Sequence, residues 1–187
     1  YYNISTGNRI VIGFAGNLGR VQGLLEFIDY IANEEVRDQL FFVIVGDGAL
    51  KPEIQNVISD KNLNHIYLAG SKSRKEQNDF INACDICLIT LKEGMYGLGV
   101  PSKTYNILSA GKPILYIGDS GSEVDRYVKE FDCGWAFSWS ERAEIASFLR
   151  SLHFSDKTEL LRKGENSLAA SKKYFEMIPN KIFIVPT

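Results

Sequence analysis

Short apolar segments alternate with amphipathic segments along almost the whole chain, and this alternation limits the folds open to it. The apolar segments lack a polar residue at every second position; all six residues of Leu40–Val45 are apolar. Such runs are typical of strands buried on both faces of a parallel sheet. We therefore predict a doubly wound parallel sheet, a Rossmann-like α/β fold, between two layers of helices. Its strands are expected at residues 9–15, 40–45, 65–69, 86–91, 113–117 and 134–137.

Helix-start signals stand between these strands. Val21 and Leu24 begin an apolar face of helical spacing after the first strand. Ser73, with a glutamate three residues later, forms a capping box, and Ser122 is an N-cap candidate. We expect Ser155 to cap a last helix that runs to about residue 174.

The composition predicts one soluble globular domain. The 187 residues are 45% hydrophobic and 24% charged, with a net charge of −2. This balance offers no basic surface for nucleic acid, and no apolar run approaches the length of a membrane span. We expect residues 1–8 to be a linker remnant of a longer protein, residues 9–175 to form the domain, and residues 176–187 to be a tail of unclear role. The odd count of three cysteines favours reduced thiols in the cytoplasm.

A glycine-rich loop before a lysine-led helix is the main candidate site. Gly97 and Gly99 precede Ser102, a good N-cap, and Lys103 opens a helix predicted over residues 103–110. Free backbone N–H groups, the positive end of the helix dipole and an ammonium would converge there. The sequence therefore predicts an anion site at the start of this helix.

Three further loops are expected at the same edge of the sheet. Residues 16–20, 46–48 and 70–72 follow the first three strands, and residues 93–103 follow the fourth. Ligands of such sheets bind beyond the carboxyl ends of the strands. We therefore expect the four loops to hold one ligand together.

Other ligands fit the sequence less well. Gly16, Gly19 and Gly23 are spaced by three and four residues, not by the two and three of the dinucleotide fingerprint, although Asp47 leaves a nicotinamide cofactor open. His65 and His153 are the only histidines, and we expect satisfied structural roles for both. The sequence contains no Asp-x-Asp pair that could bind a divalent ion together with a diphosphate.

Cys84 and Cys87 have the spacing of a redox dithiol. They precede a strand pattern, however, rather than the start of a helix. We expect two core cysteines.

Four segments together resemble the carboxy-terminal, donor-binding domain of glycosyltransferase family 4, one half of the GT-B architecture. The resemblance covers roughly residues 9–150. Within the family, the chain is most similar to a subgroup that builds bacterial surface polysaccharides, including fucosamine-type transferases. It rests on Gly16-Asn17-Leu18-Gly19 leading into Gln22-Gly23, on Val45-Gly46-Asp47-Gly48, on Ala69-Gly70, and on Val100-Pro101-Ser102-Lys103 with Ala110-Gly111-Lys112-Pro113-Ile114.

This resemblance implies a nucleoside diphosphate sugar as the donor, with UDP favoured, and neither a cofactor nor a metal. The base would lie near residues 70–72, and the diphosphate between Gly16-Asn17 and the helix start at Ser102-Lys103. No catalytic residue is assigned to this chain. The donor-binding residues implied are Gly16, Asn17, Gly19, Arg20, Gly48, Ser71, Lys72, Ser102, Lys103 and Asn106.

The resemblance also implies the setting of the reaction. A hexosyl or hexosaminyl group would be transferred, with retention, to a lipid-linked or polysaccharide acceptor at the cytoplasmic face of the membrane. The acceptor would bind to an amino-terminal domain that precedes this one. We therefore expect residues 1–187 alone to bind nucleotide without turnover.

Four positions depart from the family pattern. Leu98 and Asn106 stand where two glutamates are usual, and Asn17 and Gln22 stand where the first loop usually carries an arginine and a lysine. Asn106 can still hydrogen-bond a ribose through its amide. These changes leave two alternatives open, a non-catalytic nucleotide-binding module and a sugar-nucleotide epimerase on the same fold.

Overall fold

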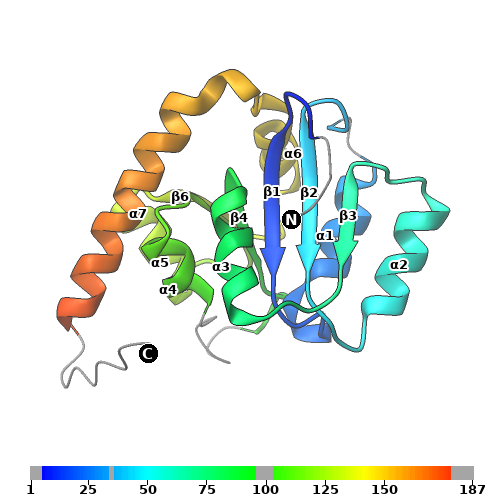
Figure 1. Cartoon of the computed structure of the whole chain (residues 1–187), viewed down its shortest axis with the longest axis horizontal. Coiled ribbons are helices and arrows are strands. Elements are labelled where there is room, and N and C mark those ends of the chain that lie inside the picture. The colour runs from blue at the N-terminus through cyan, green and yellow to red at the C-terminus, as the bar shows by residue number, and fades with distance from the viewer. Residues whose placement is uncertain (1–5, 34–35, 96–102, 178–187) are drawn as a thin grey trace.

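A six-stranded, fully parallel sheet forms the centre of the computed structural model, which describes residues 6–33, 36–95 and 103–177. The strand order is β3-β2-β1-β4-β5-β6. This is the order of the doubly wound dinucleotide-binding fold, in which the direction of winding reverses between β1 and β4. The fold prediction is confirmed. The strands are β1 (Ile10–Ala15), β2 (Leu40–Val45), β3 (Ile66–Ala69), β4 (Ile86–Thr90), β5 (Ile114–Ile117) and β6 (Gly134–Phe137) (Figure 1).

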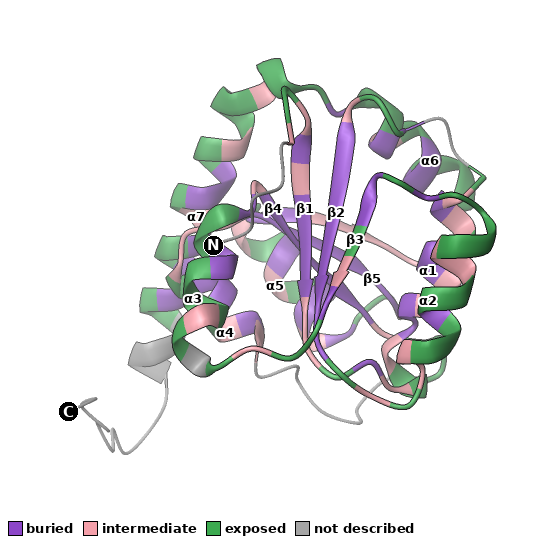
Figure 2. Ribbon diagram, turned by 45° about the vertical axis from the view of Figure 1, so that its right-hand side comes forward, coloured by how far each residue is buried: buried purple, intermediate pink, exposed green. Residues whose placement is uncertain are grey.

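Two layers of helices cover the sheet. One face packs against α1, α2 and α6, and the other packs against α3, α4, α5 and α7. The strands are buried almost throughout, whereas each helix keeps an exposed outer side (Figure 2). The helices are α1 (Leu24–Ile31), α2 (Lys51–Asp60), α3 (Arg74–Ala83), α4 (Lys103–Ser109), α5 (Glu123–Phe131), α6 (Arg142–Ser151) and α7 (Lys157–Met177), with 3₁₀ turns η1 (Arg20–Gln22) and η2 (Phe154–Asp156).

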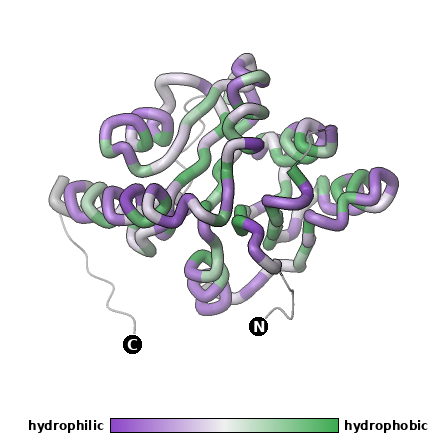
Figure 3. Tube along the Cα trace, turned by 90° about the horizontal axis from the view of Figure 1, so that it is seen from above, coloured by the Kyte–Doolittle hydropathy of each residue, from purple (hydrophilic) through white to green (hydrophobic). Residues whose placement is uncertain are grey.

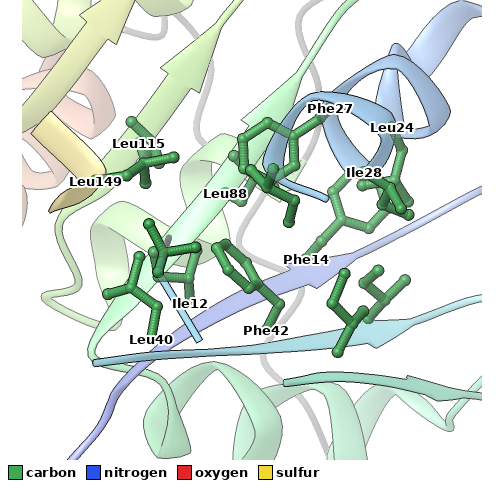
Figure 4. Close-up of a cluster of buried hydrophobic side chains, with 14 of the residues drawn as sticks. Ile12, Phe14, Leu24, Phe27, Ile28, Leu40, Phe42, Leu88, Leu115 and Leu149 are labelled. Carbon is green, nitrogen blue, oxygen red and sulfur yellow. The ribbon is translucent and has the colours of Figure 1, made fainter. Parts of the chain in front are cut away.

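The larger core lies between the sheet and the layer of α1, α2 and α6. Phe14 and Phe42 point from neighbouring strands toward Phe27 and Ile28 of α1, as Figure 4 shows. The rings of Phe27 and Phe42 meet edge to face, 5.8 Å apart between centroids. Because every second residue of a strand faces the same side, β1 and β2 each supply three side chains to this core.

The second core explains the cysteines. Cys84, Cys87 and Cys133 are buried and not disulfide-bonded, and the Cys84 thiol donates to the carbonyl of Phe80 at 3.2 Å. Contact with the Cys87 thiol and burial raise the pKa of Cys84. A Cβ on Gly13 would lie 2.1 Å from the Cys84 sulfur, so glycine makes room for that side chain. The expectation of two core cysteines is confirmed.

Two predicted helices differ from the structure. Gly23 has φ +65° and divides the helix expected after β1 into η1 and α1, which leaves Val21 44% exposed rather than on an inner face. A Cβ on Gly23 would lie 3.0 Å from the Trp139 ring and 3.1–3.2 Å from the backbone of residues 91–92, so a side chain there would be tightly packed. Ser155 does not cap the last helix, because it lies inside η2, and α7 begins at Lys157.

The described helices are amphipathic rather than apolar throughout. Figure 3 shows hydrophilic and hydrophobic stretches alternating along them. None of the described helices combines the length and apolar character that crossing a bilayer requires.

The imidazole ring of His65 occupies the core without a hydrogen-bond partner among the described residues. His65 immediately precedes β3 and is 2% exposed, and its ring meets that of Phe42 edge to face at 6.0 Å. Neither ring nitrogen has a partner. The structural role is therefore as expected, but the ring is not satisfied. Burial, with the nearby charges of Arg37 and Arg9, lowers the pKa of His65 to about 4.

We expect His65 to weaken the fold in acid. In the unfolded chain its pKa is 6.5, so between pH 6.5 and 4 the unfolded state binds a proton that the folded state does not. Stability is fully present above pH 6.5 and falls by about 1.4 kcal/mol per pH unit toward pH 4 from this group alone. In urea unfolding from pH 7 to 4.5, His65→Phe should show a smaller loss than the wild type. The control is His153→Phe, at an exposed position, which should lose as much stability as the wild type. Equal slopes of unfolding free energy against pH for the wild type and His65→Phe would contradict the role given to His65.

Candidate functional site

The loops after β1 and β2 interlock at the carboxyl edge of the sheet. The N–H of Leu18 donates to the carbonyl of Asp47 at 2.8 Å, and the N–H of Leu50 donates to the carbonyl of Leu18 at 2.9 Å. A Cβ on Gly48 would lie 2.5 Å from Oδ1 of Asn17. Gly16 and Gly48 both have φ of +155°, which glycine adopts readily and other residues do not. The glycines in these two loops therefore allow a close backbone-to-backbone contact.

Lys103, the first residue of α4, reaches across this edge to the loop after β1. Its Nζ donates to Oε1 of Gln22 at 3.1 Å and lies 4.0 Å from the centre of the Phe14 ring. A Cβ on Gly16 would lie 3.1 Å from the same nitrogen. Segments almost ninety residues apart in sequence thus place an ammonium against a glycine backbone.

No carboxylate among the described residues pairs with the ammonium of Lys103. Its hydrogen-bond partner is a neutral amide, and burial lowers the pKa of Lys103 to about 8. Desolvation disfavours the charged form, and the ring face of Phe14 offsets only part of that cost. Lys103 is still mostly protonated at pH 7. A bound anion would stabilise this charge, whereas a cation would not.

The loop after β4 is tied to three neighbouring segments. The N–H of Lys92 donates to the carbonyl of Val21 at 3.0 Å, and the Trp139 indole donates to the carbonyl of Leu91 at 2.7 Å. The N–H of Gly94 donates to Oδ1 of Asp119 at 3.1 Å. These contacts hold residues 91–95 beside the start of α1 and the loop after β5, at the same edge as Lys103.

The loop after β3 lies at the outer end of this edge. Ser71 is exposed, and Lys72 is half-buried with its Nζ 3.7 Å from a carboxylate oxygen of Glu76. A Cβ on Gly70 would lie 4.0 Å from Nζ of Lys51, the lysine that pairs with Asp47 at 2.9 Å. This pairing lowers the pKa of Asp47. A second, more exposed group of charges therefore stands at the end of β2 and β3.

The predicted site residues fall into three groups. Gly16, Asn17, Gly48 and Lys103 come together in the interlocked loops. Gly19 lies beside this group, because a Cβ there would be 3.1 Å from Nδ2 of Asn17. The remaining described ones line the same edge: Arg20 in the loop after β1, Ser71 and Lys72 after β3, and Asn106, exposed one turn along α4. Ser102 and Leu98 lie outside the described residues.

Two residues of the edge were not predicted from the sequence. Phe14 supplies the ring beneath Lys103, and Lys51 supplies a cation beside Gly70. Phe14 could have been found in the sequence as an aromatic residue near the carboxyl end of the first strand. Lys51 could have been found as a lysine shortly after Gly46-Asp47-Gly48.

Residues that could hold a metal are not grouped in the part of the chain that the structure describes. There, no cluster of three or more His, Cys, Asp or Glu side chains has the geometry to bind an ion. The hydrogen-bond donors at this edge are lysines, amides and backbone N–H groups, and such donors suit an anion.

Comparisons with known proteins agree with this geometry. The family model described as glycosyl transferases group 1 matches residues 3–163. A Pseudomonas aeruginosa protein named "Probable glycosyltransferase WbjE" is 38% identical over 128 residues, which are 67% of this chain and 31% of that protein. The chain thus corresponds to about a third of the length of this curated relative.

Solved structures share the fold. HepE of Anabaena, crystallised in complex with UDP, superposes with a TM-score of 0.71 at 20% identity, over 90% of this chain and 45% of that one. WaaG, a glycosyltransferase involved in lipopolysaccharide biosynthesis, gives a TM-score of 0.70 at 12% identity, over 88% of this chain and 43% of that one.

At sequence identities of 12–20%, the structural similarity supports only the fold. The family model, which matches most of the chain, shows the family. The chain is a member of the glycosyl transferases group 1 family, and within it corresponds to the carboxy-terminal, Rossmann-like domain of the GT-B architecture.

Proposed function

We propose that this domain, residues 9–175, binds the nucleoside diphosphate of a sugar donor, with UDP as the favoured nucleotide. The observation that carries the proposal is the Lys103 ammonium, which lies half-buried against Gly16 and Phe14 and donates to the neutral amide of Gln22. A diphosphate at this position would supply the negative charge that the lysine lacks. The exposed side chain of Arg20 lies in the same loop and would complete its coordination.

The other described residues of the edge have separate roles in this proposal. The base lies toward Ser71 and Lys72, and the Asn106 amide, one turn beyond Lys103, hydrogen-bonds the ribose. Gly16, Gly19 and Gly48 allow the backbone to approach the phosphates. Ser102 belongs to the proposed site by its position before Lys103. No metal is required, because lysine and helix N–H groups neutralise the phosphates.

The whole enzyme would transfer a hexosyl or hexosaminyl group, with retention, to a lipid-linked or polysaccharide acceptor. We place this transfer in the synthesis of bacterial surface glycans at the inner face of the membrane; the fold that the chain shares with WaaG, a glycosyltransferase involved in lipopolysaccharide biosynthesis, is compatible with the glycan class. As the glycosidic bond breaks, charge gathers on the leaving diphosphate, and a preorganised ammonium stabilises it. Acceptor binding requires the amino-terminal domain, so residues 1–187 alone bind without turnover.

The test is thermal unfolding of residues 1–187 with UDP, GDP, ADP and NAD in the presence of EDTA. A ligand at about one hundred times its dissociation constant adds roughly 2.7 kcal/mol of stability, which raises the melting temperature by about 5–10 °C. UDP should give the largest shift, and EDTA should not reduce it. A shift with NAD alone would overturn the proposal in favour of a dinucleotide site.

A transfer assay then separates an enzyme from a non-catalytic nucleotide-binding module. The domain is joined to the amino-terminal half of its own protein and supplied with UDP-sugars and a lipid-linked acceptor. UDP release that depends on the acceptor supports the transferase. Nucleotide binding without release would favour the module.

A further inference from the structure

Trp139 lies in the turn between β6 and α6, and hydrogen bonds within that turn hold it in place. The N–H and the hydroxyl of Ser138 both donate to a carboxylate oxygen of Glu141, at 2.6 and 2.9 Å. The N–H of Glu141 donates back to the carbonyl of Ser138 at 3.1 Å. The ring of Trp139 also packs against the larger core. The position of this side chain is therefore fixed by its own turn and by the core below it.

Trp139 contacts two loops at the carboxyl edge of the sheet. Its indole N–H donates to the carbonyl of Leu91, in the loop after β4, at 2.7 Å. Its ring lies against Gly23, the residue that joins η1 to α1, at 3.0 Å from where a Cβ would stand. The same Cβ would lie 3.1–3.2 Å from the peptide bond of residues 91–92. One side chain thus links the end of β4 to the start of α1.

The residues just before Gly23 include the hydrogen-bond partner of Lys103. Oε1 of Gln22 accepts from Nζ of Lys103 at 3.1 Å, and the carbonyl of Val21 accepts from the N–H of Lys92 at 3.0 Å. Gly23 has no side chain to fix this segment, and its φ of +65° lies in a region that glycine enters and leaves readily. Contacts from other segments therefore set the position of Gln22.

A second side-chain contact between these two loops is weaker. Nζ of Lys92 pairs with Oε1 of Glu26, in the first turn of α1, at 2.8 Å. Their side chains are 50% and 40% exposed, so solvent screens this ion pair. The hydrogen bond of Trp139 is partly buried and is joined by the ring contact with Gly23. Of the two contacts, the tryptophan holds the segment more firmly.

We propose that Trp139 is a positioning residue of the proposed nucleotide site. It holds Gln22 where the amide of that residue orients the ammonium of Lys103. This role rests on the proposed function, because the direction of the ammonium matters for binding only if it meets the diphosphate. Trp139 itself touches no substrate and acts through Gly23 and Leu91. A side chain that follows the sixth strand thus orders two loops that follow the first and the fourth.

The binding test compares Trp139→Phe with Trp135→Phe. Trp135, the other tryptophan of the chain, is half-buried on β6, and its ring meets that of Phe148 at 4.8 Å. Phenylalanine keeps an aromatic ring at either position, but at 139 it removes the donor to Leu91. In titration calorimetry at pH 7, Trp139→Phe should weaken UDP binding about 3- to 10-fold, the effect of one lost hydrogen bond. Trp135→Phe should bind UDP as the wild type does.

A measurement without nucleotide separates positioning from packing. In an NMR titration of the Lys103 side chain, the wild type should show a pKa of about 8. Trp139→Phe should raise this pKa toward the ordinary 10.5, because an ammonium that Gln22 no longer holds is better solvated. Trp135→Phe should leave it unchanged. In a Gln22→Ala background, Trp139→Phe should cost no further UDP affinity, since Trp139 acts through Gln22.

Three results would overturn the proposal. The first is an equal UDP affinity and an equal Lys103 pKa in the wild type and Trp139→Phe. The second is an equal loss of affinity in both tryptophan variants, which would mean a general loss of packing. The third is a full additional loss in the Gln22→Ala background. A wild type that binds no UDP would count against the proposed function instead, and the Lys103 titration would still decide whether Trp139 positions the lysine.

Discussion

Replacing Lys103 with alanine is expected to weaken UDP binding by about 10- to 150-fold. A charge-assisted hydrogen bond contributes about 1.5–3 kcal/mol, and 1.4 kcal/mol is a factor of ten in affinity. The effect should be near the upper end, because the ammonium is buried and its protein partner is only an amide. Titration calorimetry at pH 7 measures it. The control is Lys61→Ala, which removes an exposed lysine that pairs with Asp29 at 2.9 Å. Equal affinity of Lys103→Ala and wild type would remove Lys103 from the site.

A pH series on the same site distinguishes charge from shape. With a pKa of about 8, free Lys103 loses its proton as the pH rises from 7 to 9. If the diphosphate binds the ammonium, wild-type affinity falls above pH 8, approaching tenfold per pH unit. Lys103→Arg keeps its charge over this range, so its affinity should stay flat. Parallel curves for lysine and arginine would show that proton loss at residue 103 does not control binding.

The arrangement of strands was predictable because their sequence signal is local. Each run of the β2 type is apolar on both faces, and its alternation with amphipathic helical segments predicts the parallel sheet. The common edge of the glycine loops follows from the parallel direction in turn. Gly16 and Lys103, nearly ninety residues apart, could therefore be expected at one edge before their contact was observed.

The details that depend on tertiary contacts could not be predicted in this way. Gly23 has a left-handed conformation and lies against Trp139, more than a hundred residues away, and neither feature is visible in the local sequence pattern. The pairing of Lys103 with Gln22 depends on which way a long flexible side chain turns at the edge. The burial of His65 without a partner also runs against the rule that buried polar groups are satisfied. In each case a distant element overrides the local preference.

Gly46→Ala is expected to destabilise the domain by about 3 kcal/mol, at the upper end of the cost of overpacking. A Cβ at Gly46 would lie 1.9 Å from the carbonyl oxygen of Gly16. That oxygen belongs to the backbone of the loop that follows β1, so it cannot rotate away as a side chain would. The Gly16 peptide must move, and its N–H donates to the carbonyl of Val45 at 2.9 Å. Because Gly16 also lies against Lys103, the variant should lose nucleotide-induced stabilisation as well. Urea unfolding with and without UDP measures both effects.

Gly70→Ala provides the matched control at the same edge of the sheet. Gly70 follows β3 as Gly46 follows β2, but a Cβ there would meet only Nζ of Lys51, at 4.0 Å. With room for a methyl group and no unusual φ, alanine should leave stability unchanged or raise it by about 0.4–1 kcal/mol, because it restricts the unfolded chain. Opposite signs at these two glycines would locate the cost in the contact between the first two loops. Equal losses at both positions would mean that the edge tolerates no added methyl group anywhere, and the close packing of Gly16 on Gly46 would lose its special role in shaping the site.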